Sequence, residues 1–260
     1  MLYFSSHRRR TSGRWSHTVR YFVWGSRILL LFLIVDGFYL GLNWPNWDKL
    51  ASGPVPMSNF IKAYLQERKA KKDWPPLRWS RVDYVAMPEY LPRAAIVGED
   101  SRFYYHKGFD FLAFKDAMEH NLNRQAFAFG ASTISQQTVK NLFLSSSRNP
   151  LRKWHELILT WGMEYHLSKK RILELYLNIA EFGRGIYGVQ AAAQHYWGRS
   201  VSRLSRLQAA ELAATLPSPV KHNPFTYTSV FKRRTQKILY WLRRQDIEAA
   251  KRARERASNP

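Results

Sequence analysis

Residues 151–166 read LRKWHELILTWGMEYH, and their apolar side chains recur at the spacing of an α-helix. At 100° per residue, one face carries Leu151, Trp154, Ile158, Trp161 and Tyr165, and we expect this face to pack on the core. Helical spacing also predicts helices at 59–72, 93–97, 111–123, 134–142, 169–178, 188–196, 207–216 and 229–257. Apart from a short extended piece at 82–86, no strand is predicted, so the fold class is mainly α.

The N-terminal segment predicts a membrane helix. Five arginines precede residues 21–44, a mostly apolar run that is long enough to cross a bilayer, and no acid comes before Asp36. A cleaved signal peptide is the alternative, but residues 41–43 offer a poor cleavage site. Because basic residues stay on the cytoplasmic side, we expect a single span with a cytoplasmic N-terminus and the rest of the chain outside.

Composition restricts the function classes. The 260 residues include 41 Lys and Arg against 19 Asp and Glu, a net charge of +22 that indicates an anionic partner such as nucleic acid, a membrane surface or a phosphorylated substrate. The hydrophobic share of 45% allows a packed core. The chain has no cysteine, which excludes disulfide scaffolds, cysteine nucleophiles and iron–sulfur centres.

Changes in composition divide the chain into five parts. We expect a basic cytoplasmic tail at 1–20, the transmembrane helix at 21–44, and a juxtamembrane connector with a short basic helix at 45–80. The main helical domain follows at 81–228, and a basic C-terminal helix, with ten Lys and Arg against three acids, occupies 229–260.

Three familiar motifs are poor matches. The glycines at 183, 185 and 188 fit a dinucleotide fingerprint, but a helix precedes them where a strand is needed, so they indicate a turn. His155-Glu156 lacks the second histidine of a zinc protease. Ser229 and Lys232 fit a Ser-x-x-Lys pair, but no Lys-Thr-Gly follows.

Two carboxylate sites have a chemical interpretation. Glu99-Asp100 closes an apolar helix and precedes several aromatic residues, so burial would raise the pKa of a carboxyl toward that of a useful base. The alternative is a helix-end pair that bonds the local backbone. Arg152 and Glu156 are spaced i,i+4, which is either an ordinary surface pair or part of an anion clamp. Four cations fall within fourteen residues and would suit a diphosphate: Lys140, Arg148, Arg152 and Lys153.

Residues 130–137, GASTISQQ, are small or polar and open a helix. Free backbone N–H groups and amide side chains at such a position can hold phosphate or sugar hydroxyls. A simple Ser/Thr N-cap explains the composition equally well.

Five ordered blocks of the sequence resemble the signatures of the peptidoglycan glycosyltransferases, including the monofunctional transglycosylases. They are EDSRFYYHKGFD at 99–110, GASTISQQTVKN at 130–141, Arg152-Lys153-x-x-Glu156, KRILELYLN at 170–178, and FGRGIYGVQAA at 182–192 continued to Gly198. Ala131, Ser135 and Trp197 depart from the commoner residues, but no functional group is lost.

The resemblance implies a lysozyme-like helical fold of two lobes, the smaller of which dips into the bilayer. It implies that lipid II is polymerised into β-1,4-linked glycan with inversion and release of undecaprenyl diphosphate, without transpeptidase activity. Glu99 would be the general base, and Glu156 would lie at the leaving diphosphate with the four cations. Residues expected to position sugars or loops are Asp100, Ser132, Gln136, Gln137 and Asn141. The resemblance leaves open a divalent cation, Mg2+ or Mn2+, near Glu156.

Two other functions remain as alternatives. A lysozyme-like murein hydrolase or lytic transglycosylase would not need clustered cations, and a non-enzymatic basic membrane scaffold would leave the five blocks unexplained. Nucleic acid is not expected, since no nucleic-acid-binding motif is present. The expected location is the bacterial inner membrane with a periplasmic catalytic domain. The expected partners are lipid II, the growing glycan, anionic lipid and other cell-wall synthesis proteins.

Overall fold

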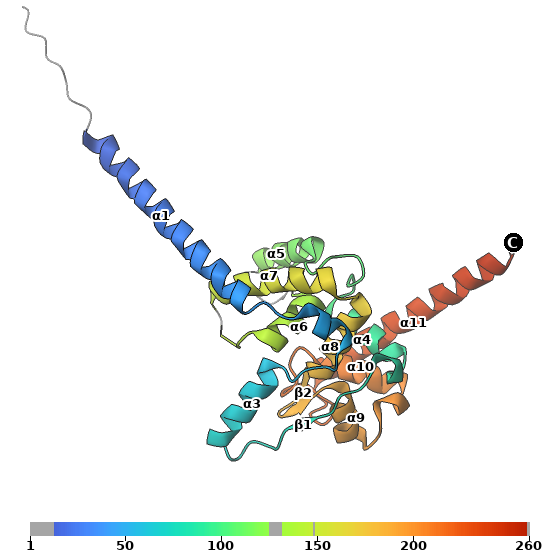
Figure 1. Cartoon of the computed structure of the whole chain (residues 1–260). Coiled ribbons are helices and arrows are strands. Elements are labelled where there is room, and N and C mark those ends of the chain that lie inside the picture. The colour runs from blue at the N-terminus through green and yellow to red at the C-terminus, as the bar shows by residue number, and fades with distance from the viewer. Residues whose placement is uncertain (1–12, 125–131, 148, 259–260) are drawn as a thin grey trace, which may run out of the picture. The chain divides into compact units, whose positions relative to one another are not determined.

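The computed structural model describes residues 13–124, 132–147 and 149–258. The chain divides into two units, Met1–Asn46 and Trp47–Pro260. In the first unit, helix α1 (Gly13–Leu42) contains the segment Val19–Leu42, which has a mean hydropathy of 1.7 and is long and apolar enough to span a membrane (Figure 1). This segment matches the predicted span at 21–44 within two residues at each end.

The second unit is mainly helical, as predicted. Its helices are α2 (Trp47–Ser52), α3 (Asn59–Ala70), α4 (Tyr90–Glu99), α5 (Phe111–Arg124), α6 (Ile134–Phe143), α7 (Pro150–His166), α8 (Lys169–Ile179), α9 (Val189–Trp197), α10 (Arg206–Thr215) and α11 (Ser229–Ser258). Most predicted helices are confirmed within a residue or two. Helix α4 is longer than the predicted range 93–97: it begins before Pro92 and continues to Glu99.

Side-chain caps define where several helices begin. Thr133 and Gln136 form a capping box at the start of α6, in which each side chain bonds the other's backbone. Asn149 accepts a hydrogen bond from the Arg152 N–H, and Pro150 occupies the first turn of α7. These caps fix the first turns of the two helices that carry the predicted site residues.

Two groups of helices build the core. Helices α4, α10 and α11 pack together, and α6 packs on both α7 and α8. One large apolar cluster includes residues from all of these helices. A smaller cluster forms around Ile61, Tyr64 and Tyr187, and α3 also contacts α6.

A small sheet was missed by the sequence analysis. Strands β1 (Arg78–Trp79), β3 (Ile186–Tyr187) and β2 (Glu181–Gly183) lie in that order, with β1 parallel and β2 antiparallel to β3. Strands of two or three residues are too short for a visible alternation. The extended piece predicted at 82–86 is wrong, because Tyr84–Ala86 form a 3-10 turn, η1. The predicted turn is confirmed. Gly185 lies in the hairpin between β2 and β3 and Gly188 directly follows β3, with φ of +75° and +80°.

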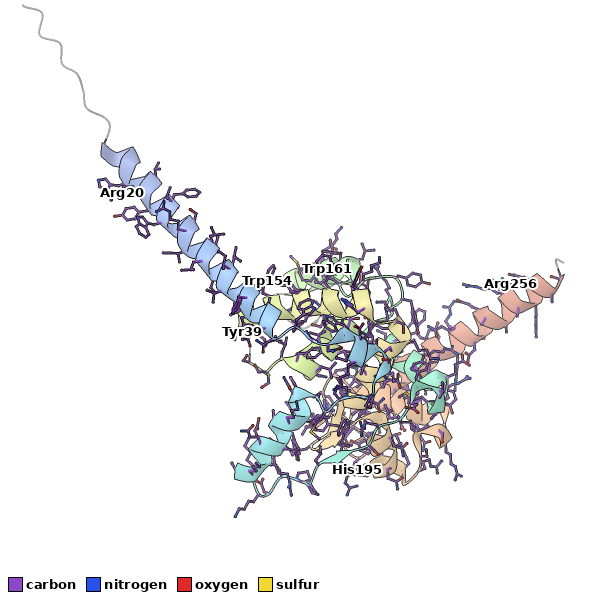
Figure 2. The ribbon with its side chains drawn as sticks, in the orientation of Figure 1. Arg20, Tyr39, Trp154, Trp161, His195 and Arg256 are labelled. Carbon is purple, nitrogen blue, oxygen red and sulfur yellow. The ribbon has the colours of Figure 1, made fainter. Side chains whose placement is uncertain are left out.

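The predicted core stripe of α7 is wrong. Leu151, Trp154, Trp161 and Tyr165 are 40, 47, 74 and 83% exposed. The face of α7 that packs inward instead carries His155, Glu156, Leu159, Thr160 and Met163. Both faces contain apolar residues at helical spacing, and periodicity cannot tell which one meets the core. The aromatic face of α7 is therefore a surface, on which Trp154 and Trp161 are labelled in Figure 2.

Candidate active site

Glu99 is the last residue of α4, where the helix ends against the core of the second unit. Its side chain is only 9% exposed. Burial raises the pKa of Glu99, and the neighbouring Asp100 charge raises it further, while a hydrogen bond from Gln137 and the charges of Arg234 and Lys140 lower it. Because burial is the largest effect, the net direction is upward, as the apolar setting of Glu99 predicted.

A chain of hydrogen bonds holds the Glu99 carboxylate. Gln137 Nε2, on α6, donates to Glu99 Oε2 at 3.0 Å, and the Tyr176 hydroxyl, on α8, donates to Gln137 Oε1 at 3.1 Å. Tyr176 is fully buried, so its hydroxyl fixes the orientation of the Gln137 side-chain amide on the side away from Glu99. Gln137 was predicted as a positioning residue; Tyr176 was quoted in a signature block but was given no role.

Arg234 is a site residue that the sequence analysis missed. Its Nη2 atom lies 3.7 Å from Glu99 Oε1, although α11 begins 130 residues later in the chain. Helix α11 buries Phe231, Thr235, Ile238 and Leu242 against the core, which turns Arg234 toward the end of α4. The 231–235–238–242 spacing was a usable signal, because it places position 234 beside the buried face.

Glu156 lies on the inward face of α7 with its side chain 3% exposed. Arg152 Nη1 donates to Glu156 Oε2 at 2.7 Å, and the Lys153 ammonium bonds the other carboxylate oxygen. This burial distinguishes the pair from an ordinary surface ion pair. The Arg152 Nε–H is buried without a hydrogen-bond partner among the residues that the structure describes.

Lys140 connects the two carboxylates electrostatically. Burial lowers its pKa, the nearby cations Arg152 and Lys153 lower it further, and the charges of Glu156 and Glu99 both raise it. Helix α6 thus presents Gln137 to Glu99 and, about one turn later, Lys140, whose pKa responds to both Glu99 and Glu156. Lys140 also lies 5.9 Å from the centre of the Phe60 ring of α3.

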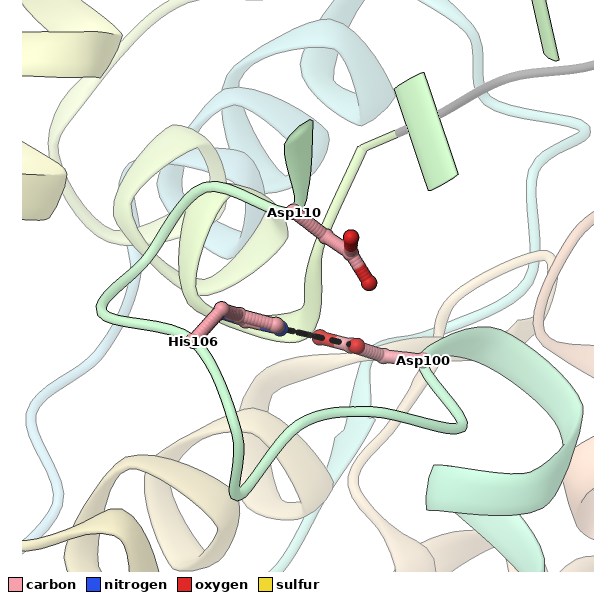
Figure 3. A group of neighbouring side chains, drawn as sticks. All are labelled: Asp100, His106 and Asp110. Atoms are coloured by element: carbon pink, nitrogen blue, oxygen red, sulfur yellow. Dashed lines mark hydrogen bonds and ion pairs between the residues drawn. The ribbon is translucent and has the colours of Figure 1, made fainter. Parts of the chain in front are cut away.

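Asp100, His106 and Asp110 brace the loop that follows α4 (Figure 3). His106 Nε2 lies 2.9 Å from Asp100 Oδ1, and Asp100 Oδ2 accepts the Ile134 N–H at 3.0 Å. Asp110 accepts hydrogen bonds from Arg102 and from the Ala113 N–H. The three side chains are close enough to share a metal ion, but these donors already engage both aspartates, and we assign them to holding the loop against α6.

The remaining predicted residues take different places. Ser132 lines, with Glu99 and Asp100, a pocket of about 410 Å³. Gln136 is buried, and its Oε1 accepts the Thr133 N–H in the capping box of α6, while its Nε2 has no hydrogen-bond partner among the described residues. Asn141 is half-buried on α6. Arg148 lies outside the described residues.

The donor set at Glu156 does not favour a metal. Both of its oxygens are engaged by cationic side chains, and divalent cations such as Mg2+ prefer several oxygen ligands. The arrangement instead suits an anion, since cations held by a buried acid would meet a diphosphate without losing their orientation.

The chain is similar to known proteins over most of its length. A family model described as "Transglycosylase" matches residues 69–243. A biosynthetic peptidoglycan transglycosylase of Janthinobacterium sp. (strain Marseille) is 40% identical over 212 residues, which cover 82% of this chain and 90% of that protein. One of Marinomonas sp. (strain MWYL1) is 43% identical over 219 residues, 84% of this chain and 86% of that protein. One of Cupriavidus metallidurans is 50% identical over 142 residues, 55% of this chain and 60% of that protein.

The matched segment runs from the end of α3 into α11, and so includes Glu99, Glu156 and Arg234. With most of its length matched, and with relatives that it covers almost end to end, the chain belongs to the transglycosylase family and has its helical, lysozyme-like fold.

Proposed function

We propose that this protein is a peptidoglycan glycosyltransferase that polymerises lipid II into β-1,4-linked glycan. The observation that carries the proposal is the arrangement around α6. Glu99, a buried carboxylate at the end of α4, accepts a hydrogen bond from Gln137 of α6, and Glu156, a second buried carboxylate, lies in the basic cluster of α7. Lys140 of α6 interacts electrostatically with both carboxylates. A base and an anion clamp beside the same helix suit a reaction in which a hydroxyl attacks and a diphosphate leaves.

Glu99 acts as the general base. Its carboxylate accepts the proton of the acceptor sugar's 4-hydroxyl while that oxygen bonds to the anomeric carbon of the donor chain. The raised pKa makes Glu99 a stronger base than an ordinary glutamate. Gln137 and Tyr176 keep the carboxylate in place, and the charge of Arg234 lowers the pKa of Glu99 against the larger effect of burial.

The basic cluster receives the leaving group. As the bond between the anomeric carbon and the diphosphate breaks, the electron pair stays on the diphosphate, whose negative charge rises. Arg152, Lys153 and Lys140 stabilise that charge, and the free Arg152 Nε–H adds a donor. Attack opposite the diphosphate inverts an α-linked donor to a β-linked product.

Positioning roles for Asp100, Ser132 and Asn141, and a part for Arg148 in the diphosphate clamp, remain expectations of the family resemblance. The side chains around Glu156 give little support for a divalent cation there, because both carboxylate oxygens are already engaged by Arg152 and Lys153. We therefore expect that any Mg2+ or Mn2+ used during turnover binds to the diphosphate of the substrate rather than to Glu156 alone.

We also propose that the aromatic face of α7 rests in the membrane interface. Leu151, Trp154, Trp161 and Tyr165 form an exposed apolar stripe, and α5 adds exposed Phe111, Leu112, Phe114 and Met118. Trp and Tyr concentrate at the level of lipid headgroups, and an amphipathic helix can bury such a face there. A single-pass anchor at Val19–Leu42 with a cytoplasmic N-terminus would hold the catalytic unit on the outer surface of the inner membrane.

A murein hydrolase is the second candidate. Cleavage uses a protonated acid at the sugar bond, and no diphosphate leaves, so a hydrolase would have no use for the cations around Glu156.

One assay separates the candidates. The full-length protein in detergent is mixed with fluorescent lipid II, with and without Mg2+ or Mn2+, and the products are resolved on a gel. We expect a ladder of glycan polymer that the Glu99→Gln protein does not form. Cleavage of preformed glycan without polymer would establish a hydrolase, and an unchanged substrate with a folded protein would contradict both enzymatic functions.

A further inference from the structure

A groove lies over β1 and α9, away from the residues assigned to catalysis. It consists of two adjoining hollows of about 300 and 230 Å³ that share Arg78. None of their lining residues lines the pocket beside Glu99. In Figure 2, His195 of this groove lies at the opposite end of the catalytic unit from Trp161 of α7.

Two arginines in the larger hollow are held in place without an acid partner. Arg78 Nη1 lies 3.2 Å from His195 Nδ1, and Arg184 lies 4.6 Å from the centre of the Trp74 ring. Burial, and secondarily the charge of Arg78, lowers the pKa of His195, so its neutral ring accepts this hydrogen bond. Within residues 13–124, 132–147 and 149–258, neither guanidinium forms an ion pair with a carboxylate.

The carboxyl group nearest to Arg184 along the chain neutralises the positive charge of Arg184 only partly. Glu181 lies on β2, three residues before Arg184, and burial raises its pKa to about 7 against the opposing effect of Arg184. Near neutral pH a large fraction of Glu181 is therefore uncharged. The hollow keeps a net positive charge on planar groups that match a carboxylate in geometry.

An aromatic wall stands beside these cations. Phe225 is 64% exposed, and its ring centre lies 5.1 Å from that of His195 and 4.9 Å from that of Tyr196. The turn that carries Phe225 is fixed, because Asn223 Oδ1 accepts the N–H groups of residues 225 and 226. A large exposed ring on a rigid turn offers apolar surface to a ligand at low entropic cost.

The second hollow makes the site longer than a single ion needs. It continues from Arg78 along β1 to Gln190 and Gln194 of α9. Strand β1 is at an edge of the sheet, and amide side chains are suited to the backbone groups of an extended chain. Length, amides, an aromatic wall and two cations together describe a site for a peptide rather than for a lone phosphate.

We propose that this groove binds an extended acidic peptide, with a carboxylate reaching Arg78 and Arg184 and a neighbouring apolar side chain lying against Phe225. The proposal does not depend on the reaction assigned to Glu99. A peptide bound there would be held by a face of the unit that the catalytic groups do not use.

The test compares two charge-matched variants of the full-length protein in neutral detergent at about 150 mM salt. The probe is a fluorescein-labelled peptide, Ala-Glu-Phe-Glu-Ala, and fluorescence polarisation measures its binding. We expect Arg78→Gln/Arg184→Gln to weaken binding at least tenfold. The control Arg199→Gln/Arg203→Gln removes the same charge from exposed arginines close in sequence and should stay within twofold of the parent.

Several results would overturn the proposal. If both double variants lost the same affinity for the peptide, the peptide would be binding to the overall positive charge of the protein and not to this groove. Equal binding of Ala-Gln-Phe-Gln-Ala would remove the carboxylate from the recognition, and displacement of the probe by inorganic phosphate at about 10 mM would make the site one for a single oxyanion.

A second variant tests the aromatic wall. Phe225→Ala should weaken the probe by several fold with an unchanged circular dichroism spectrum, and unchanged affinity would contradict the assigned pose. Arg78→Gln/Arg184→Gln should still polymerise lipid II, and Glu99→Gln should still bind the peptide. If the parent protein binds the peptide but does not polymerise lipid II, the proposed function is contradicted and the peptide site is not.

Discussion

The guanidinium of Arg234 lies 3.7 Å from the carboxylate of Glu99 and joins the C-terminal helix to the end of α4. The positive charge of this helix is divided: Arg234 faces the candidate base, while Lys232, Arg233 and Lys237 are exposed. This division leads to the first prediction.

Replacing Arg234 by Gln should shift the pH dependence of polymerisation. Burial raises the pKa of Glu99 and Arg234 lowers it, so removal of the arginine raises the pKa further. A base works when deprotonated, and its rate falls as the pH drops through its pKa, so the acid limb of the rate profile should move to higher pH. At neutral pH we expect a loss of roughly tenfold, equivalent to about 1.4 kcal/mol in the barrier.

Arg233→Gln is the matched control, because it removes the same charge from the exposed neighbouring position. Its profile should coincide with that of the parent. If both variants shift alike, the effect comes from the overall charge of α11, and Arg234 has no specific role beside Glu99.

Glu99→Gln should abolish polymerisation while the protein stays folded. The amide keeps the shape of the side chain but cannot take the proton, and loss of a general base costs about 10²–10⁴ in rate. Initial rates on fluorescent lipid II and a thermal melt measure the two effects. Activity within tenfold of the parent would place the base elsewhere.

Tyr176→Phe tests the support behind Gln137. The hydroxyl donates to the amide that donates to Glu99, so its loss frees the amide to rotate away from the carboxylate. We expect a several-fold loss in kcat with little change in KM for lipid II, because Tyr176 is fully buried and acts through Gln137. A loss confined to KM, or a rate equal to the parent's, would mean that the hydroxyl matters only for packing.

Much of the fold could be predicted from the sequence, because helix spacing and capping residues act locally. Thr133 and Asn149 mark helix starts within a residue of where they occur. The two-residue strand at Arg78 could not be predicted, since its partner Ile186 lies more than a hundred residues away and no local pattern records the pairing. The same holds for the α7 stripe, whose exposure depends on what surrounds the helix.

The site was predictable to a similar extent. Glu99, Gln137 and Glu156 lie in the signature blocks. In the structure, Gln137 of α6 bonds Glu99 of α4, and Lys140 of α6 interacts electrostatically with Glu99 and with Glu156 of α7. Arg234 was missed because it lies beyond the signature blocks, and its role follows from the packing of α11 on α4. Gln136 was expected to position sugars or loops, and its Oε1 also serves the capping box of α6, a role that the local sequence shows.

The aromatic face of α7 should determine how the catalytic unit attaches to lipid. Trp161 and Tyr165 are 74 and 83% exposed, so changing both to Gln removes apolar contact with the bilayer but little from the core. In a chain that starts at Trp47, we expect the double variant to bind neutral phosphatidylcholine vesicles at least fivefold more weakly in a sedimentation assay. Trp241→Gln is the control, because Trp241 is also exposed but lies on α11. Weaker binding by the control to the same degree would show that any exposed tryptophan suffices, and unchanged binding by the double variant would remove α7 from the membrane contact.

The basic cluster gives the last prediction. Arg152→Ala should lose most of the polymerisation rate, and Arg152→Lys should recover only part, because one ammonium cannot both hold Glu156 and reproduce the forked donors of a guanidinium. Glu156→Gln should also be nearly inactive, since Arg152 and Lys153 lose the charge that orients them. Because the diphosphate gains negative charge as its bond breaks, both kcat and the affinity for lipid II should fall, with the larger effect on kcat. The matched control is Lys115→Ala on α5, whose ion pair with Glu119 is fully on the surface. The measurements are initial rates on fluorescent lipid II and thermal melts of the same proteins. If Arg152→Ala and Glu156→Gln lowered the melting temperature but left the rate near that of the parent, the cluster would be only a structural ion pair.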